Sequence, residues 1–89
     1  MAEWDPNKER LTLRRRGITF EEASSVLDDP RRVDLEDVGH SGAEERWRSI
    51  GLSDRGRLLV VTWTWRSGRV RVITAWRATK READVNTRW

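Results

Sequence analysis

The sequence contains no cysteine and only one histidine, which excludes several kinds of chemistry. Without cysteine there is neither a disulfide nor a cysteine nucleophile. A zinc site would have to be built almost wholly from carboxylates, and no motif of spaced ligands is present. The six glycines are scattered among predicted turns instead of forming a dinucleotide-binding or P-loop motif. We therefore expect no metal site and no nucleotide cofactor.

Long apolar runs are missing as well. No stretch approaches the roughly 20 apolar residues that span a bilayer, and residues 1–9, MAEWDPNKE, lack a signal-peptide pattern. We expect a cytoplasmic protein without a membrane partner. A length of 89 residues predicts one small domain, 1–89, with a modest core.

Charged residues are abundant, but the two signs are separated along the chain. Residues 8–16 contain five cations and one acid, residues 21–45 contain nine acids and two arginines, and residues 46–81 contain ten cations and one acid. A basic surface attracts phosphate through counterion release, so nucleic acid is a candidate partner. An arginine-rich solvated face with no binding role is the alternative.

The strongest structural signal is a hairpin over residues 58–77, LLVVTWTWRSGRVRVITAWR. Two runs rich in Val, Ile, Thr and Trp are joined by Ser67 and Gly68, a two-residue turn that places Arg66 opposite Arg69. Alternation from this turn predicts that Trp65 and Trp76 share one face. The second face carries the arginines Arg66, Arg69, Arg71 and Arg77.

A first helix is predicted from Pro6 to about Arg16. Asp5 suits the N-cap, Pro6 the first helical position, and Gly17 the C-terminal stop. Three arginines at positions 14–16 complement the negative end of the helix dipole, which accounts for them without any ligand. Contact with RNA phosphates is the alternative, and it makes Arg14 and Arg15 candidate RNA-binding residues.

A second helix is predicted to begin at the capping-box pair Thr19 and Glu22 and to end at Asp28-Asp29-Pro30. Its buried side is predicted to contain Phe20, Ala23, Val26 and Leu27. Weaker signals predict strands at residues 3–4, 33–35 and 44–52, and a short helix within residues 78–85. The fold class is therefore α+β, with two N-terminal helices packed on an antiparallel sheet and a short C-terminal helix.

The inventory of arginines, one histidine and a few carboxylates suits metal-free RNA cleavage. In that reaction the 2′-hydroxyl attacks the neighbouring phosphate, which requires a base, an acid for the leaving 5′-oxygen and cations for the developing charge. Arginine can serve only the last role. His40 is the one side chain whose unperturbed pKa lies near neutrality, and Glu45 is a nearby carboxylate. A structural role for His40 in a polar loop is the alternative.

The six tryptophans divide into two groups. Trp4, Trp47 and Trp63 are predicted to lie in the core or at its edge, because an indole buries a large area. Trp65 and Trp76 are candidates for base stacking, which contributes ~1–3 kcal/mol per base. Contact with a partner protein is equally compatible with two exposed indoles.

Five blocks of the sequence resemble, in order, the BrnT family of type II toxins: EWDPNK, RRRGITFEEASSVLDDP, HSGAEERWRSIG, GRLLVV and TWRSGRVRVITAWRATKRE. The resemblance implies a RelE-like fold, ribonuclease activity that arrests growth, and a BrnA-type antitoxin that binds the toxin and represses the operon through its own DNA-binding part. Where this chain has RRG at 15–17, TWR at 64–66 and TAW at 74–76, the family usually reads Lys-His-Gly, Thr-Glu-Arg and Ser-Ala-Arg.

We therefore predict a metal-independent endoribonuclease toxin that contacts DNA only through its antitoxin. The predicted catalytic residues are His40, Glu45, Arg16, Arg66 and Arg77. The predicted RNA-binding residues are Arg14, Arg15, Arg69, Arg71, Trp65 and Trp76. A degenerate, non-catalytic toxin that acts as a corepressor, or a small RNA-binding module, is the alternative that the sequence leaves open.

Overall fold

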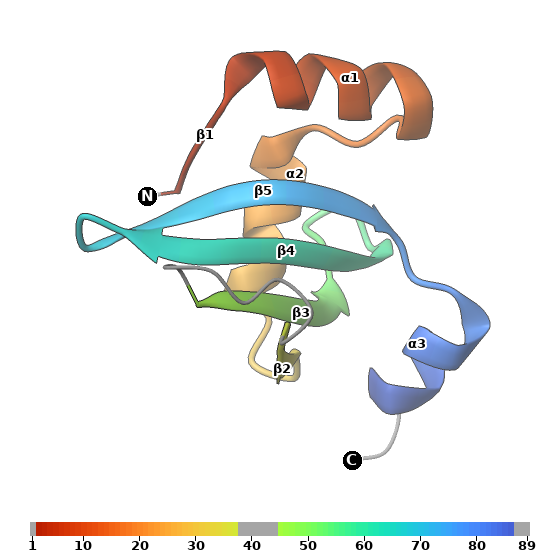
Figure 1. Cartoon of the computed structure of the whole chain (residues 1–89). Helices are drawn as coiled ribbons and strands as arrows, with labels where there is room; N and C mark the ends of the chain where they lie inside the picture. Colours follow the sequence, from red (N-terminus) through yellow and green to blue (C-terminus); the bar gives the residue numbers. More distant parts are fainter. Residues whose placement is uncertain (1, 38–44, 87–89) are drawn as a thin grey trace.

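The computed structural model describes residues 2–37 and 45–86, in which helices surround one five-stranded sheet (Figure 1). The elements in chain order are β1 (Glu3–Trp4), α1 (Pro6–Arg16), α2 (Phe20–Ser25), the 3-10 helix η1 (Val26–Asp28), β2 (Val33–Glu36), β3 (Arg46–Leu52), β4 (Leu58–Arg66), β5 (Arg69–Arg77) and α3 (Lys80–Asn86). The strand order is β1-β5-β4-β3-β2. Because β1 pairs with β5 in parallel and the other neighbours are antiparallel, the sheet is mixed and the predicted purely antiparallel sheet is wrong.

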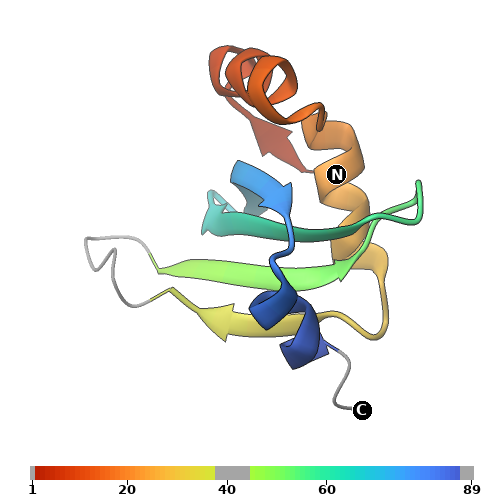
Figure 2. The ribbon, with the colours of Figure 1, turned by 90° about the vertical axis from the view of Figure 1, so that its right-hand side faces the viewer.

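The helices occupy three different positions around the sheet. The α2 helix crosses one face, α1 lies above the edge formed by β1 and β5, and α3 turns back after β5 to contact β3 (Figures 1 and 2). The prediction that both N-terminal helices pack on the sheet is therefore wrong for α1. None of the described helices is both long and apolar enough to span a membrane.

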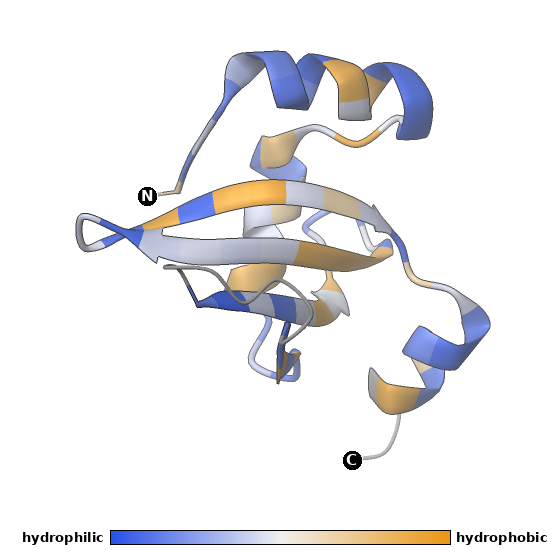
Figure 3. Ribbon diagram, in the orientation of Figure 1, coloured by the Kyte–Doolittle hydropathy of each residue, from blue (hydrophilic) through white to orange (hydrophobic). Residues whose placement is uncertain are grey.

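The sequence of α1 explains its position at the edge. Thr12 is its one buried residue, while Leu11 and Leu13 are 50% and 46% exposed. Figure 3 shows that most of α1 is hydrophilic and that β5 has a hydrophobic middle. Without an apolar stripe, α1 cannot cover a sheet face. Polar contacts fix its place, including the hydrogen bond from the Phe20 N–H to Glu9 Oε2 at 2.8 Å.

The predicted ends of α1 are confirmed. Asp5 Oδ1 accepts a hydrogen bond from the Asn7 N–H at 2.9 Å, and Pro6 occupies the first turn. Gly17 ends the helix with φ at 68°, in the left-handed region that favours glycine, and its N–H donates to the Leu13 carbonyl at 2.9 Å. The arginines at 14–16 consequently occupy the last turn, as the sequence predicts.

The start of α2 is confirmed, but one half of its predicted capping box is wrong. Thr19 Oγ1 accepts a hydrogen bond from the Glu22 N–H at 3.1 Å. The Glu22 carboxylate does not return to Thr19; it accepts hydrogen bonds from Arg57 and Ser53 instead. A guanidinium is a stronger partner for a carboxylate than a backbone N–H, so the tertiary contact prevails over the local one.

The core lies between α2, η1 and the sheet. Its buried residues are Ile18, Phe20, Ala23, Val26, Leu59, Val61, Trp63, Val72 and Ala75. Trp4 and Trp47 are partly buried against this cluster, so the predicted placement of Trp4, Trp47 and Trp63 is confirmed. The predicted apolar side of α2 is confirmed as well.

The hairpin turn has the predicted geometry. Ser67 and Gly68 both have positive φ, 53° and 76°, as a two-residue type I′ turn requires, and Arg66 pairs with Arg69. The register of the hairpin then shifts at a β-bulge. Thr62 pairs with Thr74, but Trp63 pairs with Val72, so Ile73 has no partner in β4.

The bulge reverses which side chains of β5 face the core. Ala75 pairs with Val61 on the face covered by α2, and Trp76 pairs with Val60 on the opposite face. Trp65, which precedes the shift, stays on the same face as Trp63. The prediction that Trp65 and Trp76 share a face is therefore wrong, because one inserted residue shifts strict alternation by one position.

Candidate nucleic-acid interface

Arginines gather on the sheet face opposite α2. Residues paired across strands share a face. One row therefore contains Arg46, Thr64 and Arg71, and the next contains Arg48, Thr62 and Thr74. Arg66 and Arg69 form a further row beside the turn. Thr62 and Thr64 are only 5% and 1% exposed, so the arginines of β3 and β5 flank a covered stretch of β4.

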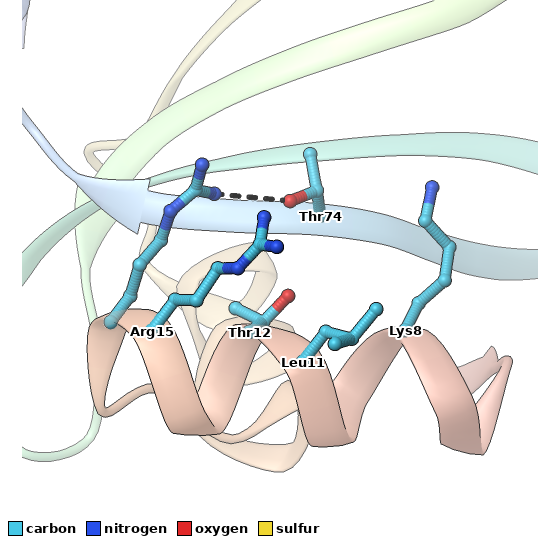
Figure 4. Close-up of a pocket in the computed structure, with 6 residues that line it drawn as sticks. Lys8, Leu11, Thr12, Arg15 and Thr74 are labelled. Carbon is cyan, nitrogen blue, oxygen red and sulfur yellow. Dashed lines mark hydrogen bonds between the residues drawn. The ribbon is translucent and has the colours of Figure 1, made fainter.

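The α1 helix lies beside this sheet face and forms one wall of a groove with β5. A hollow of about 160 Å³ separates α1 from β5 and is lined by Lys8, Leu11, Thr12, Arg15, Arg16 and Thr74 (Figure 4). A second hollow of about 190 Å³ is lined by Asp5, Lys8, Arg46, Arg66, Arg71, Val72 and Ile73. The two hollows share Lys8, and we call them together the basic groove. Six of its lining residues are cations and one, Asp5, is an acid.

Two hydrogen bonds tie Arg16, the last residue of α1, to β5. Arg16 Nη1 donates to Thr74 Oγ1 at 3.3 Å and to the Ala75 carbonyl at 2.9 Å. A guanidinium has five N–H donors, so others remain for a ligand. The side chain that ends α1 is thereby tied to β5 across the groove, with its charge directed toward the sheet.

Acidic side chains compensate part of the positive charge at the rim. Glu3 lies 3.8 Å from Arg71, with side chains that are 36% and 26% exposed, and Asp37 lies 3.4 Å from Arg48. The Asp37 side chain is only 8% exposed, whereas Glu3 and Arg71 are both partly solvated. A pair near the surface such as Glu3–Arg71 contributes only ~0–1 kcal/mol. A phosphate group can therefore compete with Glu3 for Arg71.

Several predicted site residues come together in or beside the groove. Arg15, Arg16, Arg66 and Arg71 line it. Trp76 adjoins it, since the Arg16 Cζ lies 6.0 Å from the Trp76 ring centroid. These residues come from α1, β4 and β5, and only the fold brings them together.

Other predicted residues lie elsewhere. Trp65, which is 58% exposed, and Arg69 line a separate hollow with Gly68 and Val70. Arg14 lines a hollow on the outer side of α1. Arg77 is exposed and pairs with Leu59, at the end of the hairpin opposite Arg66.

The two residues predicted to transfer protons are only partly covered by the structure. His40 lies outside the described residues. Glu45 is exposed and directly precedes β3, and its backbone carbonyl accepts a hydrogen bond from Thr64 Oγ1 at 2.5 Å. Within the described part of the chain, no three His, Cys, Asp or Glu side chains form a group that could hold a metal.

The sequence reasoning missed Lys8 and Arg46, which line the groove, and Arg48, which lies on the same sheet face. The signal for the two arginines was available, because Arg46 and Arg48 alternate with Trp47 and Ser49 in a predicted strand. Trp47 belongs to the core side, so its neighbours had to face the other way. Lys8 carried no comparable signal, since its place in the groove depends on where α1 docks.

The model of the family described as ribonuclease toxin, BrnT, of type II toxin-antitoxin system matches residues 4–82. This range contains every residue that lines the basic groove. No curated protein matches the chain.

Proposed function

Since the chain belongs to the BrnT family of ribonuclease toxins of type II toxin-antitoxin systems, we propose that it is an endoribonuclease that binds the RNA backbone in the basic groove. The observation that carries this proposal is the convergence of six cations from α1, β3, β4 and β5 on adjoining hollows. Phosphate neutralisation by such cations supplies most of the affinity for a nucleic-acid backbone.

The groove offers electrostatic stabilisation for cleavage. When the 2′-hydroxyl attacks phosphorus, negative charge develops on the phosphoryl oxygens, and guanidiniums held nearby stabilise it. Arg16 is the best candidate for this role, because its bonds to Thr74 and Ala75 hold it in place before substrate binds. Arg66 and Arg71 would hold adjoining phosphates. Arg77, outside the groove, is retained only as a weaker candidate.

Proton transfer is assigned to His40, with Glu45 as its carboxylate partner. The segment that contains His40 leads into Glu45 and then Arg46, which lines the groove. Neutral His40 would accept the 2′-hydroxyl proton, and the acid form would protonate the leaving 5′-oxygen. No step of this scheme requires a metal, and the first product is a 2′,3′-cyclic phosphate.

The family implies an antitoxin protein as partner. We extend the proposal to a BrnA-type antitoxin that neutralises the toxin in the cytoplasm and provides any contact with DNA. Trp65 and Arg69 are candidates for its binding site, since tryptophan and arginine are frequent hot-spot residues in interfaces.

The test is cleavage of a defined single-stranded RNA by the purified chain in the presence of a chelator. We expect a 2′,3′-cyclic phosphate product. His40→Ala should lower the cleavage rate by ~10²–10⁴-fold and leave RNA affinity nearly unchanged, because a proton-transfer group acts mainly in the transition state. If the parent chain binds RNA without cleaving it, the non-catalytic alternative replaces this proposal.

A further inference from the structure

We propose that Trp76 is a positioning residue that holds two phosphate-binding guanidiniums, Arg16 from α1 and Arg48 from β3, against a single indole. The inference rests on the RNA-binding function proposed for the basic groove. It adds Arg48 to the cations that bind RNA and names the residue on which two of those cations depend.

The distances support a shared ring. The Cζ atoms of Arg16 and Arg48 lie 6.0 and 5.7 Å from the Trp76 ring centroid. Both values are within the range of about 6 Å over which a cation is attracted to an aromatic ring. Trp76 faces these arginines because the bulge at Ile73 turns it away from the core. Without that bulge the ring would point toward α2.

The indole is itself fixed by the C-terminal helix. Trp76 Nε1 donates to both carboxylate oxygens of Glu82, at 3.1 and 3.3 Å. Glu82 is held by a reciprocal capping box at the start of α3, in which Glu82 Oε1 accepts the Thr79 N–H at 2.8 Å and Thr79 Oγ1 accepts the Glu82 N–H at 3.2 Å. Burial acts to raise the pKa of Glu82, but hydrogen bonds from Thr79 and Trp76 and the nearby charge of Arg48 outweigh it, so the pKa is lowered.

Each guanidinium is also held by a second group. Arg16 bonds to Thr74 and Ala75, and Arg48 pairs with Asp37 at 3.4 Å. Two long side chains of like charge would otherwise separate and sample many rotamers. Both guanidiniums can contact the Trp76 ring at the same time. Phosphate binding should therefore lose less side-chain conformational entropy than it would at two arginines without such support.

The test uses Trp76→Leu and a labelled single-stranded oligouridylate of twelve nucleotides, with affinity measured over a range of KCl concentrations. Single-stranded nucleic acid contributes roughly 0.7 units of log–log slope per phosphate contact. We expect the slope of Trp76→Leu to be shallower than that of the parent by about 1.4 units, because two contacts are lost. Trp76→Phe keeps an aromatic face but loses the hydrogen bonds to Glu82, so its slope should lie between those of the parent and Trp76→Leu. Leu52→Ala removes an exposed apolar side chain that lines neither hollow of the groove; it is the control and should not change the slope.

A double-mutant cycle separates positioning from a merely structural role. Arg48→Gln should reduce the slope by about 0.7 units in the parent and have no further effect in Trp76→Leu. A structural role alone would lower the unfolding free energy and leave the effects of the two substitutions on slope additive. An unchanged slope in folded Trp76→Leu, or additive effects, would overturn the inference.

Two further outcomes are decisive. If Trp76→Leu does not fold, Glu82→Ala removes the acceptor of the Trp76 Nε1 hydrogen bond and leaves the indole in place. The same cycle with Arg48→Gln should again be non-additive, and additivity there overturns the inference. If the parent chain shows no salt-dependent RNA binding, the proposed function fails first and the role of Trp76 falls with it. A binding parent with an unaffected Trp76→Leu refutes the positioning role alone.

Discussion

Glu22 connects three separate parts of the fold, and its replacement gives a sharp prediction of stability. Its side chain is 3% exposed and accepts hydrogen bonds from Ser53 Oγ at 2.7 Å, from Arg57 Nε at 2.8 Å and from Arg57 Nη2. Arg57 Nη2 also donates to the Gly17 carbonyl at 3.0 Å. The carboxylate therefore joins the start of α2 to the β3–β4 turn and, through Arg57, to the end of α1.

Glu22→Gln keeps the shape of the side chain but removes its charge. Hydrogen bonds to a charged group contribute ~1.5–3 kcal/mol each, and the amide cannot keep all three acceptor contacts. We expect the unfolding free energy to fall by about 3 kcal/mol, taking the loss as equivalent to one or two such bonds. A domain of this size has roughly 4–13 kcal/mol of stability in total. The melting temperature should fall by roughly 12–24 °C.

The pH dependence has a definite sign. The hydrogen bond from Arg57 is the main reason that the pKa of Glu22 is lowered, and it outweighs the opposing effect of burial. A carboxyl with a lowered pKa stabilises the fold fully above its unfolded pKa, ~4.3. This stabilisation is lost as pH falls through the lower folded pKa. The parent should therefore lose stability in acid more steeply than Glu22→Gln.

Urea unfolding followed by tryptophan fluorescence, at pH 7 and at a series of lower pH values, measures both effects. Glu21→Gln is the matched control, because Glu21 is the exposed neighbour on the same helix. The reasoning is refuted if Glu22→Gln has the same urea midpoint as Glu21→Gln. It is equally refuted if parent and Glu22→Gln lose stability in parallel as the pH falls.

Three further predictions concern local structure and RNA contacts. Thr19→Ala removes the cap of α2 and should lower the unfolding free energy by ~0.5–2 kcal/mol, measured by chemical denaturation; an unchanged midpoint would show that the cap contributes nothing. Gly68→Ala places a side chain at φ 76° and should lower thermal stability by ~1–2 kcal/mol, whereas a stabilised variant would contradict the turn geometry. Arg71→Gln should reduce the salt dependence of RNA affinity by roughly 0.7 log–log units, and Arg14→Gln, on the outer side of α1, should reduce it less. Equal slopes for parent and Arg71→Gln would mean that Arg71 is only solvated surface.

Local signals in the sequence were sufficient for the helix ends and the turn. Asp5, Gly17, Thr19 and the Ser67-Gly68 pair act through contacts a few residues away, so their roles can be predicted without knowing the fold. The buried side of α2 follows from spacing alone for the same reason. These predictions depend on geometry that every helix or hairpin shares.

Three features could not be predicted because distant contacts decide them. The bulge at Ile73 depends on what fits under α2: Ala75 is fully buried there, whereas strict alternation would have directed Trp76 toward that side. The Glu22 carboxylate accepts hydrogen bonds from Arg57, 35 positions further along the chain, and not from the Thr19 N–H that the capping box predicts. The lack of apolar residues in α1 shows that the helix does not cover a sheet face. It does not show where the helix lies instead.

The candidate site was predicted in part for the same physical reason. Arg16 and Arg66 were predicted as catalytic residues and Arg71 as an RNA-binding residue, and all three line the groove. Arg46 was missed because the alternation of strand 46–52 was not used. The bulge could not be predicted, and it moves Trp76 to the other side of the sheet. Trp65 and Trp76, which were predicted to share one face, therefore lie on opposite faces.

The parallel pairing of β1 with β5 determines when this protein can finish folding. Glu3 pairs with Arg71, so nearly the whole chain must be synthesised before β1 has a partner. Contacts between residues so far apart in sequence form late, because closing a long loop costs entropy before any contact is gained. The α1 helix directly follows β1 and carries one wall of the groove, so we expect that wall to be assembled late. A nascent chain still on the ribosome, or a fragment that ends before β5, has the arginines of α1 but no groove for them to complete.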